Sequence, residues 1–288
     1  MPVVAIAGGT SSGLGRAITI AILEQYGDGA WTPVILSRSE TRPLWLQAVD
    51  PETHIHVLAV DYSSKSSLLD ALQGVHTCIS VILAKDFSHE STMVNLLDAA
   101  IEAGCSRYVP SHWGVGPLAW DEVELLKLME PRHAASRRAE GTGTRVSSFN
   151  TGMHMNYLGI GARQVEDLSE EEQLQRLIDG GGYASSDDEI TQGCDKAGDM
   201  PDGLGGFLVS PATATAELPM TDDGEYPRMT MTMIRDVGRF VAAALDLPQW
   251  SQEMNMAGDT LPLDQIVALA EAATERTFSV RKISKLHI

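Results

Sequence analysis

The chain has 288 residues and a formal net charge of -18 at neutral pH. This length is enough for one large α/β domain, or for a nucleotide-binding domain with a smaller second lobe. The negative charge and the scattered basic residues argue against a protein that binds nucleic-acid phosphates. The three cysteines show no metal or redox spacing, and no segment approaches the roughly 20 apolar residues of a membrane span. We therefore expect a soluble, cytoplasmic protein without a nucleic-acid or membrane partner.

The first 36 residues contain a pattern that is typical of dinucleotide-binding proteins. An apolar run at Pro2–Ala7 has the length of a strand, and the glycine-rich segment Gly8–Gly15 follows it directly. An amphipathic helix is expected at Arg16–Glu24 and a second apolar strand at Thr32–Leu36. In this context glycines let the backbone approach a pyrophosphate, and the N–H groups at the helix start bind the anion. The expected cofactor residues here are Gly9, Thr10, Ser11, Ser12, Gly13, Leu14 and Gly15.

The residues after the second strand indicate which dinucleotide is bound. Ser37, Arg38 and Ser39 occupy the place where an acidic residue would accept hydrogen bonds from a ribose 2′-hydroxyl. A guanidinium suits a 2′-phosphate instead, through its charge and its forked donors. The sequence therefore favours NADP(H) over NAD(H).

Strands and helices then alternate, which predicts a Rossmann-type, doubly wound parallel sheet. We expect strands at His54–Val60, Thr77–Leu83, Arg107–Val109 and Arg145–Phe149, and helices at Ser66–Leu72, Ser91–Ala103, Asp121–Met129 and His133–Ala139. Ligands of such sheets bind at the carboxyl ends of the strands. Four more cofactor residues are expected at those ends, namely Asp61, Tyr62, Leu83 and Ser111.

The second half of the chain is less regular. Periodicity weakens between about residues 156 and 229, where glycine-rich and acidic stretches predict a substrate lobe and its lid. Amphipathic helices are expected again at Arg235–Leu245 and Leu263–Ala273. We predict an NADP(H)-binding domain at residues 1–155 and a substrate-binding lobe at residues 156–288, with some late elements packing back on the first domain.

Seven segments, in this order along the chain, carry a resemblance to one family. They are AIAGGTSSGLGRAI (Ala5–Ile18), LSRS (Leu36–Ser39), AVDYSS (Ala59–Ser64), AAIEAGCSRYVPSHWG (Ala99–Gly114), NTGMHMNYL (Asn150–Leu158), MIRDVGRFVAAALDLP (Met233–Pro248) and GDTLPLDQIVALAE (Gly258–Glu271). The chain resembles the NmrA-like and isoflavone-reductase-like proteins, which are atypical short-chain dehydrogenase/reductases, and most of all their fungal members. The resemblance implies an NADP(H)-binding Rossmann domain and a small C-terminal lobe that closes a substrate cleft over the nicotinamide.

The chain departs from this family at two places that bear on proton transfer. His112 stands where the family motif has a carboxylate, and the lysine that reductase members carry would fall near Pro131 or Arg132. The nearest lysine is Lys127, about one helical turn earlier, and His133 lies close to the expected place. The candidate catalytic residues are therefore His112, Lys127 and His133.

Four residues that flank the expected cleft are candidates for substrate binding: Trp113, Met153, His154 and Tyr157. No tyrosine is followed four places later by a lysine, so the Tyr-x-x-x-Lys mechanism of ordinary short-chain dehydrogenases is excluded. The eight histidines show no metal-ligand spacing, and we expect no metal.

These patterns predict an NADPH-dependent oxidoreductase that reduces a carbonyl, imine or conjugated double bond of a hydrophobic small molecule. The resemblance places such proteins in fungal secondary metabolism. The displaced lysine leaves open a cyclase or condensing enzyme that holds NADP(H) without net redox change. A non-enzymatic NADP(H)-sensing regulator is the third alternative. The protein is expected to be a monomer or a homodimer.

Overall fold

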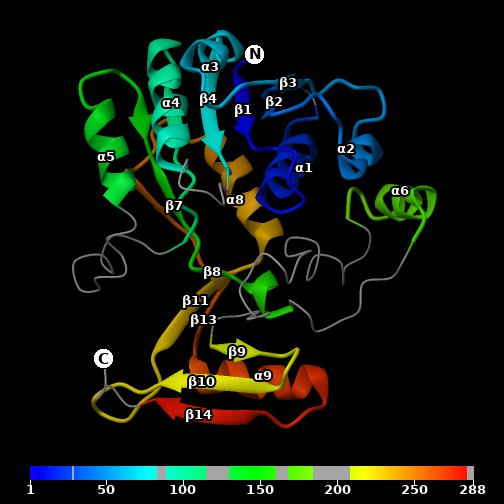
Figure 1. Ribbon diagram of the computed structural model, residues 1–288, viewed down its shortest axis with the longest axis vertical. Helices are drawn as coiled ribbons and strands as arrows, with labels where there is room; N and C mark the ends of the chain where they lie inside the picture. The colour runs from blue at the N-terminus through cyan, green and yellow to red at the C-terminus, as the bar shows by residue number, and fades with distance from the viewer. Residues whose placement is uncertain (28, 83–88, 115–129, 160–167, 184–207, 284–288) are drawn as a thin grey trace.

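The computed structural model describes residues 1–27, 29–82, 89–114, 130–159, 168–183 and 208–283, and for residues 89, 90 and 130–133 it describes the backbone only. The expected helix at Asp121–Met129 lies outside these residues. Figure 1 shows a larger upper part built around one sheet and a smaller lower lobe that holds strands and one helix.

The upper part contains a six-stranded parallel sheet with the order β3-β2-β1-β4-β5-β6. Its strands are β1 (Val3–Ala7), β2 (Thr32–Ser37), β3 (Val57–Ala59), β4 (Val75–Ser80), β5 (Arg107–Val109) and β6 (Arg145–Val146). Strand β1 pairs with β2 on one side and with β4 on the other, so the strand order reverses at β1. A ligand of a doubly wound sheet binds at this switch point, next to the carboxyl end of β1.

Helices cover both faces of this sheet (Figure 1). They are α1 (Leu14–Tyr26), α2 (Leu44–Val49), α3 (Lys65–Ala71), α4 (His89–Glu102), α5 (Glu130–Ala139) and α8 (Ile234–Leu245). Strand β1 shows why two layers form, because Val4 and Ile6 join the core with α1 and α8, whereas Ala5 and Ala7 join the core with α3, α4 and α5. The predicted doubly wound α/β fold is confirmed.

Late residues complete this upper part. Strand β7 (Ser148–Asn150) pairs in parallel with β12 (Glu253–Asn255), which lies more than 100 residues later in the printed sequence. Helix α8 packs along α1, and the two helices share a core with Phe149 and Trp250. The first 155 residues therefore do not form the whole of this layer.

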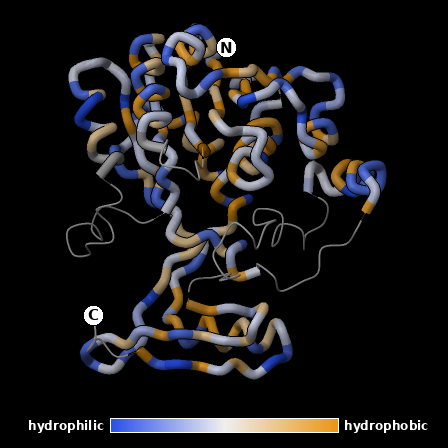
Figure 2. The backbone as a smooth tube through the Cα atoms, in the orientation of Figure 1, coloured by the Kyte–Doolittle hydropathy of each residue, from blue (hydrophilic) through white to orange (hydrophobic). Residues whose placement is uncertain are grey.

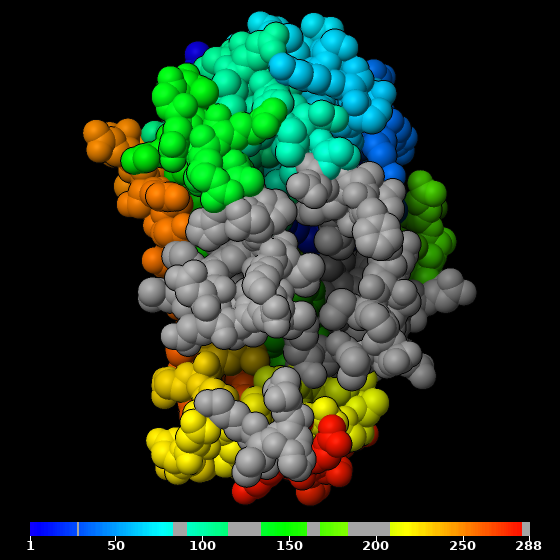
Figure 3. Space-filling model, turned by 60° about the vertical axis from the view of Figure 1, so that its left-hand side comes forward, coloured from blue at the N-terminus to red at the C-terminus, as the bar shows by residue number. Residues whose placement is uncertain are grey.

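The lower lobe is built from short strands and one helix. Its elements are β8 (Met153–His154), the 3₁₀-helix η3 (Met155–Gly159), β9 (Val209–Ser210), β10 (Thr215–Pro219), β11 (Arg228–Thr232), β13 (Asp259–Pro262), α9 (Leu263–Thr274) and β14 (Ser279–Ile283). They form the three-stranded sheets β14-β10-β9 and β13-β11-β8 around their own apolar core, which includes Leu218, Met231 and Ile266. Figure 2 shows hydrophobic and hydrophilic residues alternating along this lobe, and in Figure 3 its yellow and red residues lie at the opposite end of the molecule from α3 and α4.

Several predicted boundaries are wrong for local reasons. The strand expected at His54–Val60 begins only at Val57, because the Asp50 carboxylate accepts hydrogen bonds from the N–H groups of His54 and Ile55 and holds them in a turn. The strand expected at Arg145–Phe149 is two strands, since Ser147 stands between the pairing of β6 with β5 and that of β7 with β12. The helix expected at His133–Ala139 begins at Glu130, so Pro131 lies inside α5.

Helix α6 (Glu170–Asp179) has no counterpart among the predicted elements. It packs on α2, beside the upper sheet and outside the lower lobe, as Figure 1 shows. A capping box closes its start, in which Ser169 and Glu172 satisfy each other's backbone N–H groups.

We predict that Gly238→Ala destabilises the protein although alanine favours a helix. A Cβ at Gly238 would lie 2.2 Å from the carbonyl oxygen of Ala17 in α1, so the two helices must separate. This overpacking should lower the free energy of unfolding by about 2 kcal/mol, beyond the gain of about 1 kcal/mol in helix propensity. Urea denaturation measures the change, and Ala243→Gly, on the exposed side of α8, calibrates the propensity. A more stable Gly238→Ala protein would contradict the close packing of α1 and α8.

Candidate functional site

The segment between β1 and α1 is a tight turn in which Gly8, Gly9 and Gly15 leave no room for a side chain or have a backbone conformation that favours glycine. Gly8 has φ +79°, a conformation that side chains rarely adopt. A Cβ at Gly15 would lie 2.6 Å from the carbonyl oxygen of Gly9, and one at Gly9 would lie 2.9 Å from that of Ile6. The hydroxyl of Ser11 accepts the N–H of Gly15 at 3.1 Å and closes the turn. A side chain at Gly9 or Gly15 would therefore force this loop to change its course.

The start of α1 has the character of an anion site. Gly13 is the N-cap residue and has no side chain to cap the helix, and the first turn contains no acidic residue. The N–H groups of Gly13 and Leu14 donate no hydrogen bond to the residues that the structure describes. Free N–H groups at the positive end of a helix dipole bind phosphate groups.

The end of β2 lies beside this loop. The hydroxyl groups of Thr10 and Ser37 are 3.2 Å apart, so the glycine loop contacts the residue that precedes Arg38. Arg38 and Ser39 are exposed. Burial raises the pKa of the Tyr62 phenol, and the charge of the nearby Arg38 guanidinium offsets part of that rise. Ser12 is half-buried in the same loop. The geometry thus brings the predicted 2′-recognition residue to the same edge as the glycine loop.

Tyr62 connects the ends of three strands. Its hydroxyl accepts the N–H of Gly8 at 3.0 Å and donates to the carbonyl of Leu36 at 2.8 Å. Burial raises the pKa of this phenol well above its usual value, so the group is protonated at neutral pH. The Tyr62 hydroxyl is therefore occupied in holding the loop.

Asp61 uses its carboxylate locally. One carboxylate oxygen accepts hydrogen bonds from the Ser63 hydroxyl at 2.6 Å and from the Ser63 N–H at 2.9 Å. These two bonds lower the pKa of the Asp61 carboxyl group. The carboxylate is exposed and lies in the turn that leads into α3.

The segment after β5 is tied to the end of β4. The Ser111 hydroxyl donates to the carbonyl of Ile82 at 2.8 Å, and the Trp113 indole N–H donates to that of Ser80 at 2.9 Å. The indole ring also packs against Phe149, with ring centroids 5.6 Å apart. Ser111 and Trp113 thus contribute hydrogen bonds to the scaffold of the edge.

His112 lies between these two anchored residues and is half-buried at the carboxyl end of a central strand. It is the candidate proton donor whose side chain the structure describes. Lys127 and Leu83 lie outside the described residues, and so does the side chain of His133.

The edge of the sheet continues directly into the lower lobe. The carbonyl of Gly114 accepts the N–H groups of Thr151 and Gly152 at 2.9 and 3.1 Å. The Thr232 hydroxyl of β11 donates to the carbonyl of Thr151 at 2.7 Å. Gly152 has φ +65°, and a Cβ there would lie 2.2 Å from the carbonyl oxygen of Thr230. The lobe therefore joins the carboxyl edge of the sheet through close backbone contact.

The remaining substrate candidates lie at this junction. Met153 and His154 form β8, which pairs with β11, and Met153 packs against the core of the lobe. The rings of His154 and Tyr157 are 5.4 Å apart. His154 is only 6% exposed, its Nε2 has no hydrogen-bond partner in the described residues, and burial lowers its pKa to about 4. It is therefore a neutral imidazole at neutral pH.

The sequence does not predict the contacts of Trp45, Arg16 and Tyr183, which lie near the glycine loop. The Trp45 indole N–H donates to the carbonyl of Thr10 at 3.4 Å. Arg16 is buried in the first turn of α1, where its guanidinium lies 4.5 Å from the ring centre of Tyr183. Their partners are far along the chain, which no local pattern reveals.

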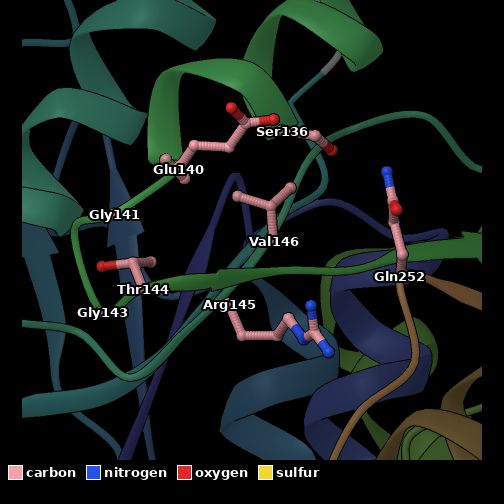
Figure 4. Close-up of a pocket in the computed structure, with 9 residues that line it drawn as sticks. Ser136, Glu140, Gly141, Gly143, Thr144, Arg145, Val146 and Gln252 are labelled. Carbon is pink, nitrogen blue, oxygen red and sulfur yellow. The ribbon is translucent and has the colours of Figure 1, made fainter.

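A cavity of about 480 Å³ lies elsewhere, at the start of β6. Its lining includes Glu140, Thr144, Arg145 and Gln252 (Figure 4). Because Arg145 is the first residue of a parallel strand, this cavity opens at the amino edge of the sheet, opposite the glycine loop.

Among the helices that the structure describes, none is long and apolar enough to cross a membrane.

We predict that Tyr62→Phe weakens dinucleotide binding and stability together. Losing the hydroxyl removes one hydrogen bond each from the Gly8 N–H and the Leu36 carbonyl, which keep the bond of 3.0 Å between them. This loss should cost about 1 kcal/mol of unfolding free energy. Because one of these groups is the N–H of Gly8, NADPH affinity measured by calorimetry should also fall severalfold.

The matched control is Tyr26→Phe. The Tyr26 hydroxyl donates to the carbonyl of Ala242 at 3.0 Å, at the other end of α1. This variant should lose similar stability and keep its NADPH affinity. An equal loss of affinity in both variants would show that Tyr62 acts only through general stability.

We also predict that His154 makes the protein less stable in acid. The unfolded chain takes up a proton near the ordinary pKa of 6.5, whereas native His154 stays neutral down to about pH 4. The stability is therefore complete above about pH 6.5 and falls by about 3 kcal/mol as the pH drops to about 4. His154→Gln should flatten this part of the pH profile in denaturant titrations, and the exposed His56→Gln should not. Parallel profiles for the wild-type protein and His154→Gln would disprove the assignment.

Comparison with known proteins gives the same fold. No family model matches the chain. It is 25% identical over 287 residues to "Oxidoreductase BOA1" of Botryotinia fuckeliana (strain B05.10), covering 98% of this chain and 79% of the relative. Among solved structures, the complex of AtPrR2 with NADP+ and (+)pinoresinol has a TM-score of 0.66 at 15% identity, covering 99% of this chain and 79% of that one. The complex of leucoanthocyanidin reductase with NADPH from Vitis vinifera has a TM-score of 0.66 at 13% identity, covering 98% and 78%. The resemblance that the motifs predict is thus confirmed in the fold, which the chain shares with solved structures of leucoanthocyanidin reductase and isoflavone reductase.

Proposed function

We propose that the protein is an NADPH-dependent oxidoreductase that reduces a carbonyl, imine or conjugated double bond of a hydrophobic small molecule. The start of α1 carries this proposal, because the N–H groups of Gly13 and Leu14 donate no hydrogen bond within the described residues and can receive an anion. The fungal relative, which aligns with nearly the whole chain, is named an oxidoreductase, and the structural neighbours include complexes with NADP+ and NADPH.

The described residues fit NADP(H). The N–H groups of Gly13 and Leu14 would hold the pyrophosphate, and any Cβ at Gly15 would collide with the loop itself. The exposed Arg38 guanidinium would pair with the 2′-phosphate. When bound, the reduced nicotinamide supplies a hydride to the substrate.

His112 is the residue that we assign to proton transfer. It follows a central strand, and its neighbours Ser111 and Trp113 are both hydrogen-bonded to the end of β4, so its backbone is held in place. An imidazole exchanges a proton readily near neutral pH, whichever way the reaction runs. Lys127 or His133 would share this role if either reaches the same point.

The substrate side of the site is assigned to Met153, His154 and Tyr157, at the junction with the lobe. In this role a thioether, a neutral imidazole and a phenol ring would offer a largely apolar surface with a few hydrogen-bonding groups. Such a surface suits an uncharged aromatic or polycyclic molecule. The fungal source of the relative supports a role in secondary metabolism.

We predict that Arg38→Ala weakens NADPH binding roughly ten- to hundredfold and leaves NADH binding nearly unchanged. The lost contact is a charge-assisted hydrogen bond of about 1.5–3 kcal/mol with the 2′-phosphate. Calorimetry with each nucleotide measures the effect. Arg281→Ala, an exposed residue of β14 in the lobe, makes the same change of net charge and should bind both nucleotides as the wild-type protein does.

Equal loss of both nucleotides in Arg38→Ala, or no loss, would overturn the choice of NADP(H). Substrate-dependent loss of NADPH absorbance tests the redox step separately. Product formation without net NADPH consumption would favour the cyclase alternative. A protein partner whose affinity differs between NADP+ and NADPH would favour the regulator.

A further inference from the structure

Helix α6 and the turn that follows it are fastened to the helices beside the glycine loop. Leu177 and Tyr183 are buried in one apolar cluster with Ile20 of α1 and Trp45 of α2. Gly182 has φ +91°, and a Cβ there would lie 2.5 Å from Ile20 and 2.6 Å from Val49, so the turn lies directly on both helices. We call residues 170–183 the α6 strap.

Tyr183 lies between two arginines from different helices. The guanidinium of Arg16 in α1 is 4.5 Å from the ring centre, and that of Arg235 in α8 is 4.8 Å from it. The ring is only 4% exposed. A cation over an aromatic face is attracted by the ring, most strongly where water is excluded. Tyr183 thus connects the strap to the first turns of both α1 and α8.

The strap also has two routes to the glycine loop. Arg16 follows Gly15 directly, and its N–H donates to the carbonyl of Ser11 at 3.0 Å. On the other side, the indole of Trp45 donates to the carbonyl of Thr10, in the same loop. A displacement of the strap would therefore disturb the packing that holds both sides of the loop.

The charges of the two arginines that contact Tyr183 favour an anion nearby. Arg16 and Arg235 both lie in the first turn of a helix, where the helix dipole disfavours a positive charge. A bound pyrophosphate at the start of α1 would offset this repulsion for Arg16. Bound dinucleotide and a docked strap then favour the same arrangement.

The strap is docked through a few residues. Leu177 is the buried residue of α6, Ile178 on the same helix is 50% exposed, and Gly182 and Tyr183 make the other buried contacts. The capping box adds to the stability of the helix itself. An element docked through so few buried residues opens at a lower cost in free energy than the core of the sheet, so its docking responds to a ligand nearby.

We propose that the α6 strap is coupled to the dinucleotide, with Tyr183 as the positioning residue that transmits the coupling through Arg16. This inference rests on the proposed function, since it takes NADP(H) as the ligand of the loop. Because coupling is reciprocal, NADPH should favour the docked strap by the same factor by which the docked strap favours NADPH.

The test combines amide hydrogen exchange of residues 170–183 with calorimetric NADPH binding, in the full chain. In the wild-type protein, saturating NADPH should slow exchange in the strap at least fivefold. Tyr183→Ala should speed this exchange and weaken NADPH binding at least fivefold. Tyr183→Phe keeps the ring between the arginines and should behave as the wild type, as should Ile178→Ala on the exposed side of the helix.

Tyr183→Ala with fast strap exchange and unchanged NADPH affinity would overturn the coupling. If that variant does not fold, the wild-type protein decides alone: NADPH binding without slower strap exchange overturns this inference and leaves the proposed function intact. A wild-type protein that binds no NADPH overturns both.

Discussion

The site depends on how the carboxyl edge of the parallel sheet satisfies its own backbone. Strands that end together leave carbonyl and N–H groups without partners in the ladder, and burying them unpaired costs free energy. Here, side chains from neighbouring strand ends provide further partners. Tyr62 bonds both the Gly8 N–H and the Leu36 carbonyl, which also bond each other, while Ser111 and Trp113 join the segment after β5 to the end of β4. These hydrogen bonds fix the course of the loops that bear the expected cofactor and proton-transfer residues.

This use of polar side chains changes the interpretation of several motifs. A tyrosine or serine at a strand end reads in the sequence as a ligand-binding residue. Tyr62 and Ser111 give their hydroxyl protons to backbone carbonyls, whereas the neighbouring Arg38 is exposed beside the loop, and ligand binding by all three stays a prediction. The edge thus contains both residues that hold its shape and residues that are exposed. Position along the chain does not separate the two kinds.

The sequence was sufficient for the sheet and the glycine loop because their signals are local. Apolar runs of strand length, a glycine pattern and amphipathic helices each occupy a short window, and β1, α1 and β2 lie where these signals predict them. A second lobe and its helix were predicted, but strands of the lobe such as β8 and β9 were not, because they contain two residues each, too few for any alternation. Trp45, Arg16 and Tyr183 escaped for another reason, since their contacts join residues 35 to 167 positions apart, and only the folded chain brings them together.

The return of the chain to the upper sheet has a consequence for how this protein can be made. Strand β12 pairs with β7, and α8 covers α1 from the side that Phe149 and Trp250 also share. The first 155 residues to leave the ribosome therefore leave one apolar face of the upper part open to water. That face is covered only when α8 and β12 have emerged, and β13, α9 and β14 of the lobe follow later still. The upper part consequently cannot close during synthesis until most of the chain has been made.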